Sequence, residues 1–174
     1  MRTIEKTVYK FDELSDEAKE TAINDNRYIF HEFDWYDAVY EDAKTVGVKI
    51  ERFDLDIFFI AIELYHDMYR VCDKIKEYHG DSCDTYKIAV EFQLRHDTLV
   101  EKYSDGIKTD EVHEDNYHEF DSELDELEDE FKDTIGAEYL SKLRQEYEYI
   151  TSDEYISEHL IDNSYEFYED GKVY

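Results

Sequence analysis

The chain has 174 residues, of which 48 are Asp or Glu and 19 are Lys or Arg, so its formal net charge is −29. A surface this negative repels nucleic acid and anionic membranes and attracts cationic partners. Such a charge is typical of disordered chains, but 41% hydrophobic and 16% aromatic residues supply enough apolar surface for a core. The composition predicts one folded, very acidic domain over residues 1–174.

The first part of the chain alternates strand and helix patterns. Alternating β-branched residues over 3–11 predict a strand, and Ser15 is expected to cap the helix that follows. An apolar stripe at helical spacing predicts a second helix over residues 34–46. Residues 48–65 are rich in apolar and β-branched side chains and are long enough for two strands, with the turn between them at 54–56.

Helical spacing dominates the middle of the chain. Apolar residues repeat every three or four positions over residues 68–78 and again over 82–103, and a loop is expected at 104–110. The same spacing then runs from 117 to 150. It predicts an amphipathic helix that is broken or turned near Gly136, or a helical hairpin.

The C-terminal segment predicts a capped helix and a hairpin. Ser152 is expected to cap a short helix that ends near Leu160, and Asp170-Gly171 between aromatic and β-branched residues predicts a turn. The elements together predict an α+β fold. We expect a small antiparallel sheet from the N-terminal strand, the 48–65 region and the C-terminal hairpin, covered by about five helices.

The sequence contains no motif for catalysis or cofactor binding: G-x-S-x-G, the Walker lysine, G-x-G-x-x-G and H-E-x-x-H are all absent. Cys72 and Cys83 lack the spacing of a zinc site and are expected to be reduced thiols. His96 lies on the apolar face of its predicted helix and is expected to be a core histidine. We therefore expect no enzymatic activity and no cofactor.

Two acidic clusters have spacings that divalent metals accept. His118 lies three residues from Asp115 and from Asp121, and Asp54 and Asp56 form a D-x-D pair. A helix this acidic produces such pairs by chance, and the EF-hand pattern is absent. A solvated helix face and a turn between strands are the simpler interpretations, so we expect no metal site.

The densest negative charge lies between residues 110 and 133, where 13 of 24 residues are acidic and Lys132 alone is basic. The helical spacing of its apolar residues favours a folded helix over a disordered tail. Carboxylates four residues apart on a helix stand about 5–6 Å from each other, on the scale of neighbouring phosphates along a DNA strand. A solvated face remains the alternative to a phosphate-mimicking one. The predicted partner-binding residues are Tyr117, Glu119, Asp121, Glu123, Asp125, Glu126, Glu128, Asp129 and Glu130.

Three segments bear on a family relationship: VYKFDELSDEAKETAINDNR, DWYDAVYEDAKTVGVKIERFDLD and TSDEYISEHLIDNSYEFYEDGKVY. The first contains Y-x-F-D-E-L-S-x-E-A-K-x-x-A-I after a short strand. In these segments the chain resembles a family of small phage and prophage proteins, and IFFIAIELYH is the segment that matches least. The resemblance implies an accessory protein that acts in the bacterial cytoplasm. Small acidic phage proteins are often counter-defence factors, including anti-CRISPR and anti-restriction proteins.

The charge and the resemblance favour a non-enzymatic inhibitor. We expect it to bind the basic surface of a bacterial nucleic-acid-binding protein, such as a CRISPR effector nuclease, through the acidic helix and without contacting nucleic acid itself. The alternative is an antitoxin-like or assembly protein whose acidity serves only solubility. Neither an apolar leader nor a run of roughly 18 apolar residues occurs, so the chain is expected to be soluble and cytoplasmic.

Overall fold

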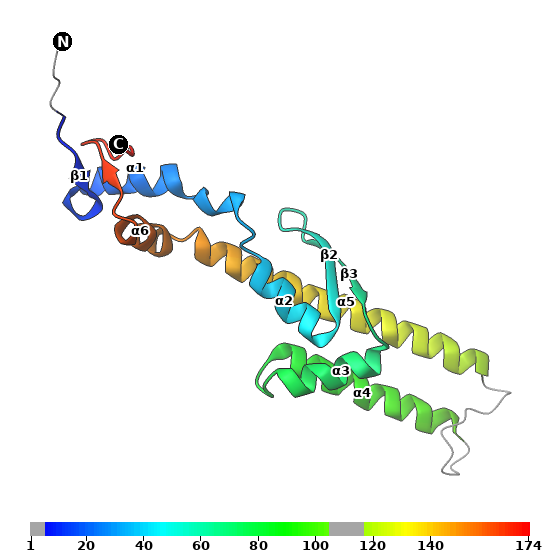
Figure 1. The fold of residues 1–174 in the computed structure, drawn as a ribbon. Helices are drawn as coiled ribbons and strands as arrows, with labels where there is room; N and C mark the ends of the chain where they lie inside the picture. The colour runs from blue at the N-terminus through cyan, green and yellow to red at the C-terminus, as the bar shows by residue number, and fades with distance from the viewer. Residues whose placement is uncertain (1–5, 105–116) are drawn as a thin grey trace. The chain divides into compact units, whose positions relative to one another are not determined.

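The computed structural model describes residues 6–104 and 117–174. In this part of the chain, helices predominate over four strands (Figure 1). The elements are β1 (Tyr9–Lys10), η1 (Phe11–Glu13), α1 (Asp16–Asn26), η2 (Ile29–Glu32), α2 (Asp37–Val46), β2 (Val48–Asp54), β3 (Phe59–Leu64), α3 (Met68–Tyr78), α4 (Asp84–Tyr103), α5 (Tyr117–Ile150), α6 (Asp153–Asp162) and β4 (Glu166–Phe167).

The predicted α+β class and the antiparallel pairing are confirmed, but the strands form two sheets instead of one. Strands β1 and β4 pair with Tyr9 opposite Phe167, while β2 and β3 pair with each other. Within the described residues the N-terminal strand covers only Tyr9–Lys10: residues 6–8 are not in a strand, and the chain turns into the 3-10 helix η1 at Phe11. Residues 1–5 lie outside the described part of the chain.

Contacts divide the chain into two compact units, and the first consists of residues up to 36 together with 145–174. Its buried cluster comprises Phe11, Leu14, Ala18, Ala22, Ile156, Leu160 and Phe167. Both predicted helix caps are confirmed. The Ser15 hydroxyl accepts a hydrogen bond from the Ala18 amide, and the Ser152 hydroxyl accepts one from the Tyr155 amide.

The predicted C-terminal turn is also present in this unit. The Gly171 amide donates to the Tyr168 carbonyl oxygen at 3.0 Å, and Val173 bridges back to Phe167. Gly171 has a φ of +85°, and a Cβ at this position would meet the main-chain carbonyl of Ala18. The position therefore requires glycine for two reasons, the left-handed backbone and the close approach to α1.

The second unit consists of residues 37–144 and contains α2, the β2–β3 hairpin, α3, α4 and most of α5. Helix α2 begins at Asp37, three residues later than predicted, and ends before Gly47, whose φ is +91°. The hairpin turn covers residues 55–58, slightly beyond the predicted 54–56. It lies there because the Asp54 carboxylate accepts hydrogen bonds from the amides of Asp56 and Ile57.

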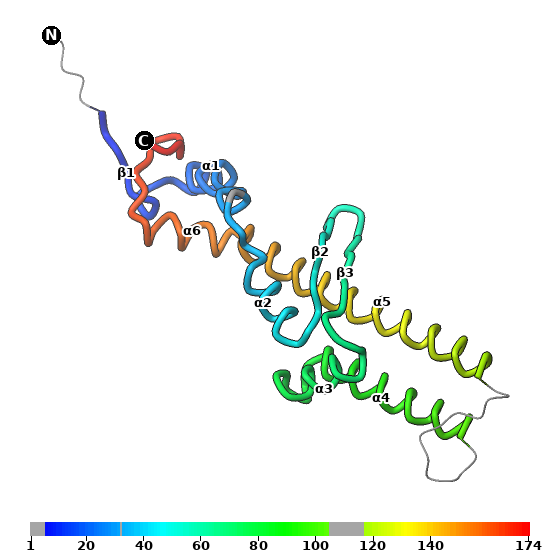
Figure 2. Tube along the Cα trace, turned by 45° about the vertical axis from the view of Figure 1, so that its right-hand side comes forward, coloured from blue at the N-terminus to red at the C-terminus, as the bar shows by residue number. Residues whose placement is uncertain are grey.

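Helix α5 is continuous from Tyr117 to Ile150, so the predicted break near Gly136 is wrong. The β2–β3 hairpin crosses α5 in both views of the chain (Figures 1 and 2), and it contacts the helix at Gly136. A Cβ on Gly136 would lie 3.4 Å from Ile60 Cγ2 and 3.7 Å from Ile62 Cδ1. The glycine therefore lets the hairpin lie close against the helix, and this packing offsets its poor helix propensity.

Candidate partner-binding surface

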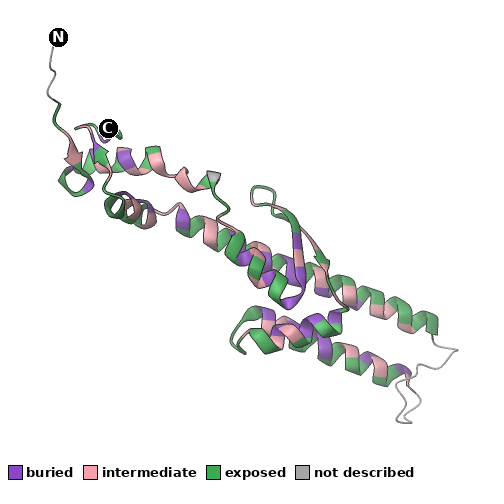
Figure 3. Cartoon of the chain, viewed as in Figure 1, coloured by how far each residue is buried: buried purple, intermediate pink, exposed green. Residues whose placement is uncertain are grey.

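Helices α4 and α5 lie side by side in the second unit, and aromatic rings fix which face of α5 meets α4. The centroids of the Phe92 and Phe131 rings are 4.7 Å apart, and those of Tyr103 and Phe120 are 5.8 Å apart. Leu127 is buried between these two contacts. The apolar spacing found in the sequence therefore faces α4, and over residues 117–133 the opposite side of α5 remains exposed (Figure 3).

Glu123, one of the predicted partner-binding residues, is engaged within the chain. The Lys102 ammonium donates to both of its carboxylate oxygens, at 2.7 Å and 2.8 Å, and the Tyr103 hydroxyl donates at 2.9 Å. These donors hold the pKa of Glu123 below its ordinary value. Glu123 thus joins α4 to α5.

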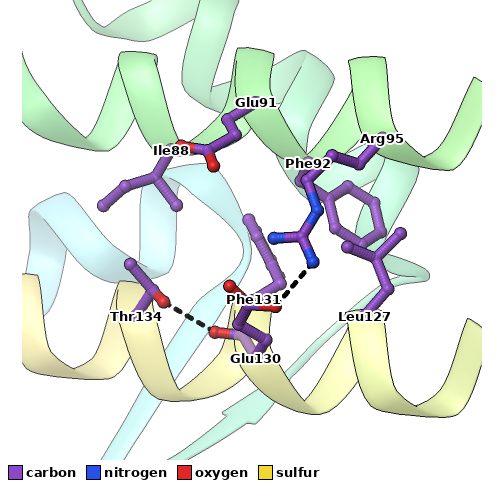
Figure 4. A pocket seen from close by; sticks show the side chains of 8 residues that line it. All are labelled: Ile88, Glu91, Phe92, Arg95, Leu127, Glu130, Phe131 and Thr134. Carbon is purple, nitrogen blue, oxygen red and sulfur yellow. Dashed lines mark hydrogen bonds and ion pairs between the residues drawn. The ribbon is translucent and has the colours of Figure 1, made fainter. Parts of the chain in front are cut away.

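Glu130 has the same role two helical turns later. The Arg95 guanidinium donates to its carboxylate at 2.7 Å and lowers its pKa. Figure 4 shows this pair at the mouth of a cavity of about 130 Å³ that α4 and α5 line with apolar side chains, Phe92 and Phe131 among them. We call the ion pairs Lys102–Glu123 and Arg95–Glu130 the two clamps between α4 and α5. Because each carboxylate faces a cation of α4, its negative charge is partly neutralised.

Most of the other acidic residues of this segment are exposed, and Glu126 among them also borders α4 across an open groove. We define the outer acidic face of α5 as the exposed residues Glu119, Asp125, Glu126, Asp129 and Asp133. They recur at helical spacing over 15 residues, or about 21 Å of helix. Lys132 lies 3.6 Å from Asp129 and offsets part of this charge.

The remaining predicted partner-binding residues flank this face. Asp121 and Tyr117 are exposed, and Glu128 is half-buried. Phe120, expected as a second aromatic anchor, is instead half-buried against Tyr103. Tyr117 is therefore the accessible aromatic residue at this end of α5.

Between the two clamps, α4 and α5 form an open groove of about 630 Å³ that the sequence did not indicate. Its apolar lining is Leu94, Leu99 and Leu127, and Leu94 remains 66% exposed. The seven-residue spacing of Arg95 and Lys102, matched by that of Glu123 and Glu130, is the sequence signal that pairs these two helices.

A partly buried polar network is a second cluster of chemically active groups in the same unit. The His79 imidazole hydrogen-bonds the Thr85 hydroxyl at 2.7 Å through Nδ1 and the Asp42 carboxylate at 3.1 Å through Nε2. Lys142 donates to the same carboxylate at 3.0 Å. Carboxylate, imidazole and hydroxyl follow the order of a hydrolase triad, but Thr85 is fully buried and inaccessible to a substrate. The network therefore joins α2, the end of α3, α4 and α5, which carry Asp42, His79, Thr85 and Lys142 in that order.

Among the described residues, no group of three or more His, Cys, Asp or Glu side chains is arranged to hold a metal ion. The candidate cluster around His118 extends into residues 105–116, outside the described part. His96 is half-buried between the rings of Tyr69 and Phe92, and its Nδ1 has no hydrogen bond within the described residues.

The hairpin tip is another feature that sequence reasoning missed. Ile57, Phe58 and Phe59 were expected to begin the second strand. Strand β3 begins only at Phe59, and all three side chains are exposed. Arg52 lies over the Phe59 ring at 5.0 Å, and Arg144 lies over the Phe58 ring at 4.4 Å. The second unit therefore carries an apolar, arginine-flanked tip as well as an acidic helix face.

No helix in the described ranges is both long and apolar enough to cross a membrane. Comparison with models of protein families, with curated proteins and with solved structures finds no match. The likeness to phage proteins therefore stays a prediction.

Proposed function

We propose that this protein is a non-enzymatic, phage-type counter-defence inhibitor that binds a bacterial nucleic-acid-binding protein, for example a CRISPR effector nuclease. Its outer acidic face would occupy the basic channel in which the target holds a phosphate backbone, within the cytoplasm of the host cell. The observation that carries this proposal is the row of five exposed carboxylates along one face of α5. Such a row presents negative charge repeatedly in one direction.

The clamps to α4 support the proposal because they hold the helix in a defined orientation. Glu123 and Glu130 direct their carboxylates to Lys102 and Arg95, and Phe131 is buried against α4. The outer carboxylates are then displayed on a pre-ordered helix, and binding need not order the segment first. A pre-organised surface loses less conformational entropy on binding.

The net charge of −29 adds long-range attraction toward a basic channel. Opposite charges steer association and raise its rate, and the gain falls steeply as salt is added. We therefore expect association with the target to slow markedly with increasing ionic strength. Dissociation should depend less on salt, because it is governed by the contacts of the docked complex.

The test is a charge reversal on the outer acidic face. Glu119, Asp125, Asp129 and Asp133 are replaced by Lys, and Glu126 is kept because it also lines the groove. A panel of CRISPR effector nucleases and restriction enzymes is assayed for DNA cleavage with and without the protein. We expect the unmodified protein to inhibit a panel member and the variant to lose that inhibition while keeping its circular dichroism spectrum.

A matched control carries the same change in charge on the other unit. Glu20, Glu158, Asp162 and Glu169 are exposed there, and their replacement by Lys leaves α5 unaltered. This control should still inhibit. Equal inhibition by both reversed variants and the unmodified protein would show that the outer acidic face is not the binding surface.

The hairpin tip favours a second candidate function, an antitoxin-like or assembly protein whose acidity serves only solubility. Three neighbouring apolar side chains, those of residues 57–59, are exposed there, which is typical of contact with an apolar partner surface. Binding through the tip should resist salt, whereas binding through the acidic face should not. Partner capture at low and high salt separates the two candidates.

A further inference from the structure

The hairpin tip exposes more apolar surface than a turn between two strands requires. Ile57 is 71% exposed and Phe58 is 62% exposed. Turn positions favour Gly, Asn, Asp and Ser. Two large apolar side chains in succession are unfavourable there, because their surface is exposed to water. Their exposure indicates that another apolar surface covers them in some state of the protein.

The backbone at the tip is also strained. Phe58 has a φ of +53°, in the left-handed region that bulky residues rarely adopt. Arg144, on α5, places its guanidinium 4.4 Å from the centre of the Phe58 ring, and Arg52 does the same for Phe59 at 5.0 Å. The strained turn thus holds an aromatic ring outward, with a positive charge beside it.

The groove between α4 and α5 has the complementary properties. Its volume of about 630 Å³ lies in the range of sites that bury a small ligand, so it can accept two large side chains. Leu94, Leu99 and Leu127 supply its apolar lining. Its charged lining carries three carboxylates and two cations, because Glu126 lies beside the two clamped pairs.

We propose that this protein associates with itself head to tail, with the hairpin tip of one copy seated in the α4–α5 groove of the next. Ile57 and Phe58 would contact the leucines of the groove, and the tip arginines would lie near Glu126. The apolar side chains of the tip thereby contact the apolar lining of the groove. The arginines lie beside Glu126, the carboxylate of the groove that has no cation of its own among the described residues.

The positions of tip and groove within the second unit make this contact heterologous. The hairpin packs on α5 at Gly136, through Ile60 and Ile62. The groove lies on the side of α5 that meets α4, where Leu94 and Leu127 line it. Each copy therefore carries one tip and one groove on different sides of α5. Contacts of this kind generate rings or open chains rather than a single two-fold pair.

The first test is sedimentation velocity of the unmodified protein over a wide concentration range. We expect species larger than a dimer to appear as concentration rises, and to appear earlier at high salt, because salt screens the repulsion between copies of charge −29. A single monomeric species at every concentration and salt level would overturn the proposal.

Two substitutions interrupt the contact from either side. Phe58→Gly removes the ring and suits a positive φ, so it should preserve or improve folding while weakening association about tenfold or more. Leu94→Glu places a charge in the groove on an exposed position of α4 and should have the same effect. Val90→Glu is the matched control, since Val90 is exposed one turn away and does not line the groove.

Mixing the two variants gives the decisive result. The Phe58→Gly chain keeps a groove and the Leu94→Glu chain keeps a tip. At concentrations where the unmodified protein associates, each variant alone should be largely monomeric, and the mixture should form a one-to-one pair that grows no further. Variants that associate like the unmodified protein, or a mixture that does not pair, would refute the proposal. The outcome is independent of the charge reversal above, which alters neither Phe58 nor Leu94.

Discussion

The ammonium nitrogen of Lys102 lies 2.7 Å and 2.8 Å from the two carboxylate oxygens of Glu123 and so joins α4 to α5. The same carboxylate accepts a hydrogen bond from Tyr103, whose ring is buried. Glu123 was predicted to bind a partner, but it instead holds α5 against α4. The outer acidic face of α5 is displayed as a result.

Replacing Glu123 with Gln should lower the melting temperature, because the amide cannot pair with Lys102 as an ion. The effect should be small, since both side chains are about half exposed and water screens their attraction. Differential scanning fluorimetry measures it. Glu119→Gln, the same substitution on the outer acidic face, should leave the melting temperature nearly unchanged or raise it slightly.

The pH dependence of this pair follows from the lowered pKa of Glu123. A carboxylate with a lower pKa in the folded state contributes stability above its unfolded pKa and loses it as pH falls through the folded value. The difference in melting temperature between the unmodified protein and Glu123→Gln should therefore be greatest near neutral pH and shrink below about pH 4. A difference that grows with acidity would contradict this assignment.

Gly136→Ala should stabilise the protein. Alanine is the better helix former by about 1 kcal/mol, and its methyl group would make ordinary contacts with Ile60 and Ile62 at 3.4 Å and 3.7 Å. Gly136→Leu should instead cost about 1–3 kcal/mol, because the larger side chain would displace the hairpin. Urea denaturation of both variants tests the packing. Equal stability of the two would show that the hairpin is not held against α5.

The helices were predicted well because caps and apolar spacing involve residues close together in the sequence. The caps at Ser15 and Ser152 and the helical spacing over α3 and α4 needed no information from distant residues. The continuity of α5 through Gly136 depends on packing against Ile60 and Ile62, more than 70 positions earlier in the chain. A lone glycine within a helical pattern does not reveal such a partner.

The candidate surface was predicted in part for the same reason. Helical spacing placed the acidic residues on α5, but it did not show that Glu123 and Glu130 face α4. Arg95 pairs with Glu130, and Lys102, seven residues later, pairs with Glu123, seven residues earlier; this opposite progression is the signature of an antiparallel helix pair. The hairpin tip was missed because an apolar run is typical of a buried strand, and nothing in its residue types shows that Phe58 lies in the turn.

Thr85→Val should destabilise the protein by about 1–3 kcal/mol, because the His79 Nδ1 atom would lose its partner at a buried site. The two side chains have nearly the same shape, so the loss reports the hydrogen bond rather than a cavity. Thr85→Ser retains the hydroxyl and should cost about 1 kcal/mol for the missing methyl group. If valine is tolerated better than serine, the network does not stabilise the fold.

The two cysteines should react very differently with a thiol reagent. Cys72 is buried, and burial raises the pKa of its thiol to about 12, whereas Cys83 is exposed. Since the thiolate is the reactive form, we expect Ellman's reagent at mildly alkaline pH to modify one thiol per native chain. The second thiol should react only after urea unfolds the protein.

Cys83→Ser is the control for this assignment. It should abolish the reaction of the native chain, and Cys72 should still react after urea unfolds the protein. The same variant should raise the melting temperature, because Cys83 occupies the N-cap of α4 without a side-chain cap hydrogen bond. A serine hydroxyl there can accept a bond from a first-turn amide and contribute about 0.5–1 kcal/mol. A native chain in which both thiols react would contradict the burial of Cys72 on the inner face of α3.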